Sequence, residues 1–418
     1  MKRLNGNCLL AQSGGPTSVI NASVYGVIKE FLSLNPDCKV FAGIYGIEGI
    51  MDNKIVEIGN ISKELLESIK YMPSAIFGSC RYKLKDVKDS EAEYEKIFSR
   101  FKEYNIRYFY YIGGNDSMDA AYKLDEYAKS INYDINIIGV PKTIDNDLEG
   151  TDHCPGFGSA VKYASNVAME LWMDINAYSF NSIMVLETMG RDTGWIAAAT
   201  GIIKKSIPDI NQLIYVPEIA FSEDKLLQEA KKAYDNYGKL LIVTSEGLRD
   251  DKGQYISADA NCYEKDVFGH KQLGGIGKYI QTLLKNNIDK RVKLTELGVP
   301  QRCAMHLVSK VDLDEAEMVG REAVKYSLKD NSGYMVGLKR CTEDAHAYEY
   351  KCTTELVELK EVCNMVKHVP TDWFHKENKN INQNMINYIE PLMSGEVNCF
   401  DKNGLLKYAD LSKVLKYK

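Results

Sequence analysis

The sequence of 418 residues contains no Cys-x-x-Cys pair, although it has ten cysteines spread along its length. This spacing argues against a zinc ribbon and against the dense disulfide framework of small secreted proteins. Free thiols in a reducing compartment are the simpler interpretation. We therefore expect a cytoplasmic protein.

Long apolar runs and long basic runs are also missing. The apolar run near the amino terminus, Cys8–Ala11, is far too short for a signal-peptide core or a membrane span. No run of lysine and arginine is long enough to follow a nucleic-acid backbone, and the formal net charge is −6. We expect neither a membrane nor a nucleic acid as a partner.

Short apolar runs alternate with longer amphipathic segments through most of the chain, which is typical of a parallel α/β sheet. This pattern predicts strands at residues 7–12, 39–45, 107–112, 135–140, 182–187, 212–216, 239–244, 292–297 and 334–338. It predicts helices at residues 22–34, 91–104, 118–129, 159–174, 224–237, 271–285 and 312–328.

The chain is roughly two to three times as long as a typical single domain, so at least two lobes are expected. The predicted fold class is α/β, with two Rossmann-like lobes, mostly parallel sheets flanked by helices, and an active site in the cleft between them. We place residues 1–150 with 301–345 in one lobe and residues 151–300 with 346–418 in the other. Because ligands of open parallel sheets bind beyond the carboxyl ends of the strands, the strand-to-helix turns should carry the functional residues.

Two of these turns contain paired glycines. In Ser13-Gly14-Gly15-Pro16-Thr17-Ser18 the pair lets backbone N–H groups approach a phosphate, although a plain tight turn has the same composition. Gly113-Gly114-Asn115-Asp116-Ser117 adds a carboxylate, which would repel a phosphate unless a divalent cation bridges the two. Asp116 therefore suggests Mg²⁺, and a helix N-cap is the alternative.

The turn from Pro141 to Asp147 combines a lysine with two carboxylates, Lys142, Asp145 and Asp147. Phosphoryl transfer to a hydroxyl needs charge neutralisation and removal of the hydroxyl proton, and this turn offers a group for each task. A surface turn rich in Asp and Asn is the alternative.

Later strand ends add further charged candidates. Arg191, with Gly190 before it and Gly194 after it, offers a planar fork for a phosphate, and an Arg–Asp surface pair is the alternative. Carboxylates at strand ends suit sugar hydroxyls as hydrogen-bond acceptors. The remaining candidates are Glu218, Glu246, Arg291 and Arg302.

Taken in order, these turns resemble the phosphofructokinase family from about residue 8 to about residue 340. Several motifs in the family's order are far more specific than any one alone. The pieces that carry the resemblance are Ser13-Gly14-Gly15, Phe77-Gly78-Ser79-Cys80-Arg81, Gly113-Gly114-Asn115-Asp116-Ser117, Pro141–Asp147, Met189-Gly190-Arg191, Pro217-Glu218 and Gln301-Arg302.

The resemblance implies roles for individual residues. Asp145 would accept the proton of the sugar 1-hydroxyl, with Thr143 and Lys142 beside it as further catalytic groups. Asp116 and Asp147 would hold Mg²⁺. The phosphoryl donor would be held by Gly15, Arg81 and Ser117, in the lobe of residues 1–150 with 301–345. Fructose 6-phosphate would contact Thr143, Ile144, Asp145, Met189, Gly190, Arg191, Glu218, Arg291 and Arg302.

The resemblance also indicates the donor. Family members that use ATP carry glycine at the positions of Asp116 and Lys142, whereas members that use pyrophosphate look like this chain. The Asp116 carboxylate should repel the α-phosphate of a nucleotide, while Lys142 neutralises charge on pyrophosphate. The implied reaction is reversible glycolytic phosphorylation of fructose 6-phosphate by pyrophosphate, in a homodimer or homotetramer.

Two alternatives stay open at this point: an ATP-dependent phosphofructokinase, and a regulatory subunit that binds sugar phosphates without turnover. Three positions depart from the family pattern, namely Asn115 where many members have aspartate, Val299, and Ser182. The first weakens the predicted metal shell, and the others leave sedoheptulose 7-phosphate open as a second acceptor. Residues 341–418 suggest no chemical role, and we expect them to complete the second lobe or to form a subunit contact.

Overall fold

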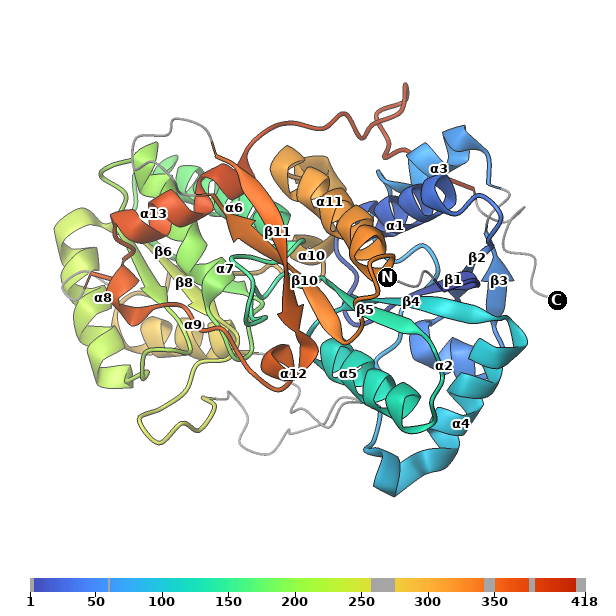
Figure 1. The fold of residues 1–418 in the computed structure, drawn as a ribbon. Helices are drawn as coiled ribbons and strands as arrows, with labels where there is room; N and C mark the ends of the chain where they lie inside the picture. The colour runs from blue at the N-terminus through green and yellow to red at the C-terminus, as the bar shows by residue number, and fades with distance from the viewer. Residues whose placement is uncertain (1–3, 59–60, 257–274, 342–349, 376–379, 411–418) are drawn as a thin grey trace.

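The computed structural model describes residues 4–58, 61–256, 275–341, 350–375 and 380–410. Two lobes lie side by side, each built around its own sheet (Figure 1). The cysteines in these ranges form no disulfide. No described helix combines the length and apolar character that crossing a bilayer requires.

The first lobe contains a seven-stranded sheet in the order β11-β10-β5-β4-β1-β2-β3. Its inner strands are parallel, and the two edge strands β3 and β11 run antiparallel to their neighbours. The strands are β1 (Asn7–Gln12), β2 (Val40–Gly43), β3 (Ile55–Glu57), β4 (Ile106–Gly113), β5 (Asn136–Pro141), β10 (Tyr334–Arg340) and β11 (Cys352–Glu358).

Helices cover both faces of this sheet. On one face lie α1 (Ile20–Leu34) and α11 (Lys310–Ser327). The two helices can pack closely because Gly320 has no Cβ, which would lie only 2.2 Å from the Ser23 carbonyl oxygen. On the other face lie α4 (Val87–Glu103) and α5 (Asn115–Ser130). The shorter helices of this lobe are α2 (Gly46–Met51), α3 (Lys63–Ile69) and α12 (Leu359–Val362).

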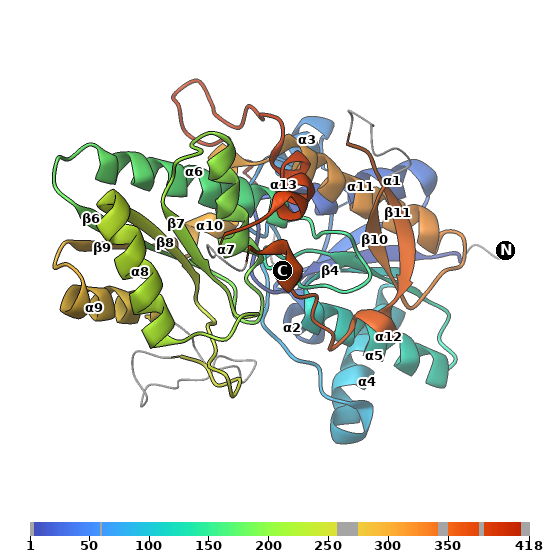
Figure 2. The ribbon, with the colours of Figure 1, turned by 90° about the vertical axis from the view of Figure 1, so that its left-hand side faces the viewer.

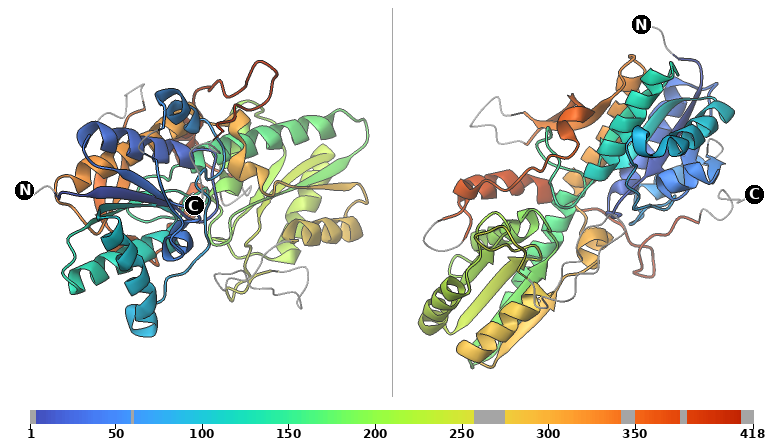
Figure 3. Two further views of the ribbon diagram at one scale, coloured as in Figure 1. Left: turned by 90° about the vertical axis from the view of Figure 1, so that its right-hand side faces the viewer. Right: turned by 90° about the horizontal axis from the view of Figure 1, so that it is seen from below.

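The second lobe contains a four-stranded parallel sheet in the order β7-β8-β6-β9, covered on both faces by helices (Figures 2 and 3). Its strands are β6 (Ser182–Thr188), β7 (Gln212–Tyr215), β8 (Lys239–Ser245) and β9 (Val292–Glu296). One face packs on α6 (Phe157–Asn176) and α7 (Trp195–Ala199), the other on α8 (Glu223–Tyr237) and α9 (Ile276–Asn287). Short elements complete the chain: η1 (Thr200–Lys205), α10 (Pro300–Cys303), η2 (Met305–Leu307), η3 (Thr371–Trp373), α13 (Gln383–Ile389) and η4 (Pro391–Met393).

The predicted α/β class is confirmed, and each predicted strand is present within two residues of its expected ends. The sequence missed β3 and β11. Of the helix predicted at residues 271–285, the first four residues lie outside the described ranges, and the described helix begins at Ile276.

The carboxyl-terminal region differs from our expectation that residues 346–418 belong to the second lobe. Strand β11 pairs with β10 and extends the first sheet, and α12 packs against α5. From about Val369 the chain packs on the second lobe, where α13 contributes Met385 to the core. Cys399 returns to the first lobe beside Val19. This region therefore contacts both lobes.

Candidate active site

The turns after β1, β4 and β5 lie next to one another because these three parallel strands are neighbours and end in register. Gln12 pairs with Ile112, and Gly113 pairs with Pro141. The backbone N–H of Lys142 donates to the Gly113 carbonyl at 3.0 Å. The glycine pairs and the lysine–carboxylate turn therefore meet at one edge of the sheet, as the sequence predicted for parallel strands.

The Arg81 segment reaches the same edge from a loop. Gly14 N–H donates to the Cys80 carbonyl at 2.9 Å, and the Ser79 hydroxyl donates to the Gly14 carbonyl at 2.6 Å. These bonds hold the loop beside the first glycine turn. Arg81 is the residue after Cys80, so its backbone lies next to the candidate phosphate-binding turn.

Three cations gather around Gly15. The buried Lys142 ammonium donates to the Gly15 carbonyl at 2.9 Å, and a Cβ at Gly15 would lie 2.8 Å from Arg302 Nη1. Burial, followed by the Arg302 and Arg81 charges, lowers the pKa of Lys142 to about 7, although Asp145 acts in the opposite direction. Clustered positive charge beside a glycine turn is suited to an anion such as a phosphate.

The Asp145–Asp147 turn brings two carboxylates together next to these cations. Asn146 between them has a left-handed backbone (φ 53°), a conformation that asparagine tolerates. Burial, together with the charges of Asp147 and Glu246, raises the pKa of Asp145, and Arg191 opposes the shift. A carboxylate with a raised pKa is a stronger base, so Asp145 has the character of a general base.

Two oxygen atoms at this turn are suited to a hard cation. Asn115 Nδ2 donates to Asp147 Oδ2 at 3.1 Å, which sets the two side chains against each other. Among the described residues, Asn115 Oδ1 and Asp147 Oδ1 are buried and accept no hydrogen bond. Buried oxygen atoms without partners are costly unless a cation or water satisfies them, and oxygen is the ligand that Mg²⁺ prefers.

This pairing revises the importance of Asn115, which the sequence marked only as a weak replacement for aspartate. Asp116, the other predicted metal ligand, is the second residue of α5, directly after Asn115, and its carboxylate lies 3.9 Å from the Lys83 ammonium. Ser117, predicted to bind the donor, is buried in the same helix turn against Gly113.

The second lobe presents the turn after β6 toward Asp145. The Thr193 hydroxyl donates to the Asp145 carbonyl at 2.9 Å, which ties the two turns together across the lobes. Met189 N–H donates to Gln301 Oε1 at 3.0 Å, and Gly190 N–H donates to Glu246 Oε1 at 3.3 Å. The Arg191 charge acts on both Asp145 and Glu246, and it opposes the rise in pKa that burial causes in each.

The sequence proposed both Glu218 and Glu246 as acceptors for sugar hydroxyls, and the resemblance assigned Glu218 to fructose 6-phosphate. In the structure the Glu218 carboxylate accepts from Gly194 N–H at 3.0 Å and from Val369 N–H at 3.0 Å. Glu246 accepts a longer bond from Gly190 N–H, and its charge acts on Asp145.

Arg291 is not brought to the other candidates. It precedes β9, at the amino end of a strand that runs parallel to β6, whereas Met189 follows the carboxyl end of β6. Its guanidinium pairs with Asp289 at 2.9 Å and lies 5.5 Å from the ring centroid of Phe180. The Ile144 side chain is buried in the core of the second lobe, which leaves its backbone as the part that could contact a substrate.

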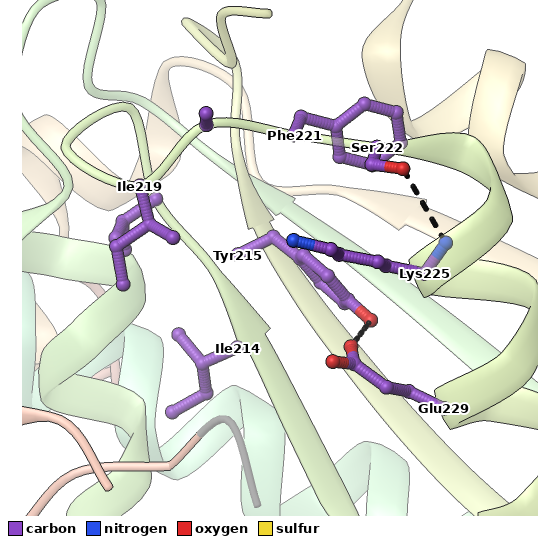
Figure 4. Close-up of a pocket in the computed structure, with 9 residues that line it drawn as sticks. Ile214, Tyr215, Ile219, Phe221, Ser222, Lys225 and Glu229 are labelled. Atoms are coloured by element: carbon purple, nitrogen blue, oxygen red, sulfur yellow. Dashed lines mark hydrogen bonds between the residues drawn. The ribbon is translucent and has the colours of Figure 1, made fainter. Parts of the chain in front are cut away.

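A hollow beneath the start of α8 lies apart from these residues (Figure 4). Tyr215, whose hydroxyl donates to Glu229 at 2.8 Å, forms part of its wall, and Ser222 caps the helix above it. None of the predicted site residues lines this hollow. The candidate site is therefore the edge of the first sheet with the facing β6 turn.

Comparison with known proteins agrees with this geometry. Residues 7–326 match the family model described as Phosphofructokinase. The pyrophosphate–fructose 6-phosphate 1-phosphotransferase of Xanthomonas campestris pv. campestris is 37% identical over 98% of this chain and 97% of its own length. The sulfofructose kinase of Alkalicoccus urumqiensis is 34% identical over 90% of this chain and 93% of its own.

A solved structure is similar as well. The crystal structure of the pyrophosphate-dependent phosphofructokinase from Marinobacter aquaeolei has a TM-score of 0.86 and 33% sequence identity, covering 99% of this chain and 98% of that one. The chain belongs to the phosphofructokinase family.

The buried ammonium leads to a stability prediction for Lys142→Met in the ligand-free protein. The substitution removes a buried charge and one hydrogen bond to Gly15. We expect the free energy of unfolding to rise by about 1–3 kcal/mol near neutral pH, since an apolar replacement of a poorly compensated buried charge is stabilising. The pKa of Lys142 lies below its ordinary value of 10.5, so between about pH 7 and pH 10.5 the unfolded chain binds more protons than the folded chain.

The free energy of unfolding of the wild type should therefore rise with pH between about 7 and 10.5. The difference in this free energy between Lys142→Met and the wild type should become smaller over the same range. Thermal unfolding across this pH range measures both effects, with the exposed Lys88→Met as the matched control. A lower unfolding temperature for Lys142→Met than for the wild type would contradict the prediction.

Proposed function

We propose that this protein transfers a phosphoryl group from pyrophosphate to the 1-hydroxyl of fructose 6-phosphate, giving fructose 1,6-bisphosphate and phosphate. The observation that carries the proposal is the gathering of Lys142 and Arg302 around Gly15, next to Arg81 and to the turn that carries Asp145 and Asp147. The similarity to enzymes named for this reaction supports it over nearly the full chain. Because a phosphoanhydride is exchanged for an ester without nucleotide, the reaction should run in both directions.

On the donor side, Gly15, Arg81 and Ser117 would bind the pyrophosphate, and Lys142 would neutralise charge that develops as the bridging P–O bond breaks. Arg302, beside Gly15, would hold fructose 6-phosphate. The Lys142 ammonium already lies against the Gly15 carbonyl, so little rearrangement is needed. Asp116 would exclude a nucleotide because its carboxylate occupies the start of α5, where further phosphates of ATP would extend.

We propose that Mg²⁺ is the cation of this site, held by Asn115 and Asp147 through their buried oxygens, with Asp116 beside them. When bound, the ion would neutralise phosphate oxygens and orient the pyrophosphate. The role of the chain itself is to keep these oxygens together, which the hydrogen bond from Asn115 to Asp147 does.

On the acceptor side, Asp145 would take the proton of the 1-hydroxyl as its oxygen attacks phosphorus and phosphate leaves. Thr143 supports the base, because its hydroxyl oxygen accepts from Asp145 N–H at 3.1 Å. Met189, Gly190 and Arg191 would hold the sugar phosphate, and we add Glu246 as an acceptor for a sugar hydroxyl.

Sulfofructose should be tested as a second acceptor because one relative is named sulfofructose kinase. A sulfonate differs from a phosphate monoester mainly by carrying one negative charge fewer near neutral pH. Turnover of 6-deoxy-6-sulfofructose should therefore be measured beside fructose 6-phosphate. A homodimer or homotetramer and a cytoplasmic location stay predictions from the sequence.

The donor is tested by assaying pyrophosphate and ATP side by side with Mg²⁺ and fructose 6-phosphate. We expect turnover with pyrophosphate and little with ATP, because Asp116 and Lys142 favour the smaller donor. The double variant Asp116→Gly with Lys142→Gly should lose activity with pyrophosphate and shift its preference toward ATP. Faster turnover with ATP by the wild type would overturn the proposal.

The base is tested by Asp145→Ala. We expect kcat to fall by about 10³-fold with a smaller change in the KM for fructose 6-phosphate, since general-base catalysis contributes on this order. Steady-state kinetics measures both constants, and Asp37→Ala removes an exposed carboxylate as control. Near-normal kcat in Asp145→Ala would remove Asp145 from the catalytic role.

A further inference from the structure

The chain crosses from the first lobe to the second along residues Lys367–Val369, which we name the crossing segment. On one side Lys367 N–H donates to the Asp147 carbonyl at 2.9 Å. On the other side Trp195 Nε1–H donates to the Lys367 carbonyl at 2.9 Å, and Val369 N–H donates to Glu218 at 3.0 Å. The segment is thus bonded to the proposed catalytic turn and to the second lobe at once; its red trace runs between α12 and α13 in Figures 1 and 2.

The Lys367 side chain turns back toward the first lobe and uses every donor of its ammonium. It donates to Asn146 Oδ1 at 3.4 Å, to the Thr151 carbonyl at 3.0 Å and to the Asp152 carbonyl at 2.8 Å. A lysine ammonium has three N–H groups, and all three acceptors lie in or just after the Asp145–Asp147 turn. The ammonium also lies 5.6 Å from the ring centroid of Trp195.

Asn146 connects these contacts to the chemistry. It lies between Asp145 and Asp147 and has a left-handed backbone conformation. Its amide is fixed on three sides: Oδ1 accepts from Cys154 N–H at 3.0 Å and from Lys367, while Nδ2 donates to the Tyr388 hydroxyl at 2.8 Å. Two of these partners come from the carboxyl-terminal region.

Nearby charges act in the same direction as these hydrogen bonds. Burial lowers the pKa of the Lys367 ammonium, and the carboxylates of Asp152, Asp147 and Glu149 oppose that shift. Lys367 is thus bonded to the turn that carries Asp147, through its N–H to the Asp147 carbonyl and its ammonium to Asn146, whereas the Lys142 ammonium is bonded to Gly15.

From these contacts we infer that Lys367 is a positioning residue for the proposed catalytic turn, acting through Asn146 and the carbonyls of Thr151 and Asp152. The inference rests on the proposed function. It gives the carboxyl-terminal region a role in the reaction, although position 367 lies beyond the matched residues 7–326. A displaced Asp145 would bind the sugar but hold its hydroxyl poorly, and such misplacement lowers turnover rather than affinity.

The test compares Lys367→Met and Lys367→Gln with Lys360→Met, which removes an exposed lysine seven positions earlier that pairs only with Glu358 among the described residues. We expect kcat per folded enzyme to fall by about 10²-fold in both Lys367 variants while both KM values change little. Lys367→Arg, which keeps the charge and can still donate, should recover part of the loss, and Lys360→Met should match the wild type.

A second readout separates positioning from general destabilisation. If Lys367 acts through Asn146, the kcat of the double variant Lys367→Gln with Asn146→Ala should be close to that of the less active single variant. The two losses of kcat should therefore not multiply. Thermal unfolding gives the folded fraction, and Lys367→Gln serves where Lys367→Met does not fold.

The outcomes distinguish the inference from the function on which it rests. Absence of turnover by the wild type with pyrophosphate and fructose 6-phosphate would remove the proposed function. An active wild type, with kcat per folded Lys367→Gln enzyme within about twofold of normal, would overturn the positioning role alone, as would losses that multiply in the double variant.

Discussion

The burial of the Lys142 ammonium against the Gly15 carbonyl is the interaction on which the site depends. In the ligand-free protein this cation lies near Arg302 and Arg81, and burial with their repulsion lowers its pKa to about 7. The fold therefore keeps these positive charges close together, which is unfavourable in itself and becomes favourable when an anion binds between them. Interactions that gain strength only with ligand present are those that favour binding and the transition state.

The rest of the architecture supplies what this arrangement needs. Three neighbouring parallel strands, β1, β4 and β5, end in register and bring a glycine turn, an acidic turn and the lysine turn to one edge. The second lobe is bonded to the lysine turn through the hydrogen bond from Thr193 to Asp145. The crossing segment is bonded to the same turn through the hydrogen bond from Lys367 to Asn146. Positioning and charge neutralisation are the main contributions expected of a phosphoryl-transfer site.

Much of this could be predicted from the sequence because parallel strands are continuous apolar runs that end at glycines. The two strands that were missed, β3 and β11, are antiparallel, lie at sheet edges and are only half-buried, so they lack that signal. The lobe assignment of residues 346–418 failed for the same reason. Without β11, nothing in the sequence indicated that the chain returns to the first sheet before it crosses over.

The surroundings of several predicted site residues depend on local folding. Glu218 and Glu246 both end strands, but only the folded turns determine that Glu218 accepts from Gly194 and Val369 while Glu246 accepts from Gly190. Arg291 was chosen for its charge, and strand direction puts it at the amino end of β9, away from the other candidates within this chain. Asn115 looked like a weaker ligand, and its importance follows from a contact with Asp147 that sequence cannot supply.

Calorimetry of pyrophosphate binding tests the central claim most directly, because the heat measured in buffers of different ionisation enthalpy gives the number of protons taken up. If Lys142 is largely neutral without ligand and charged beside pyrophosphate, the wild type should take up more protons above neutral pH than Lys142→Met does. Equal proton uptake by the two proteins would contradict the account.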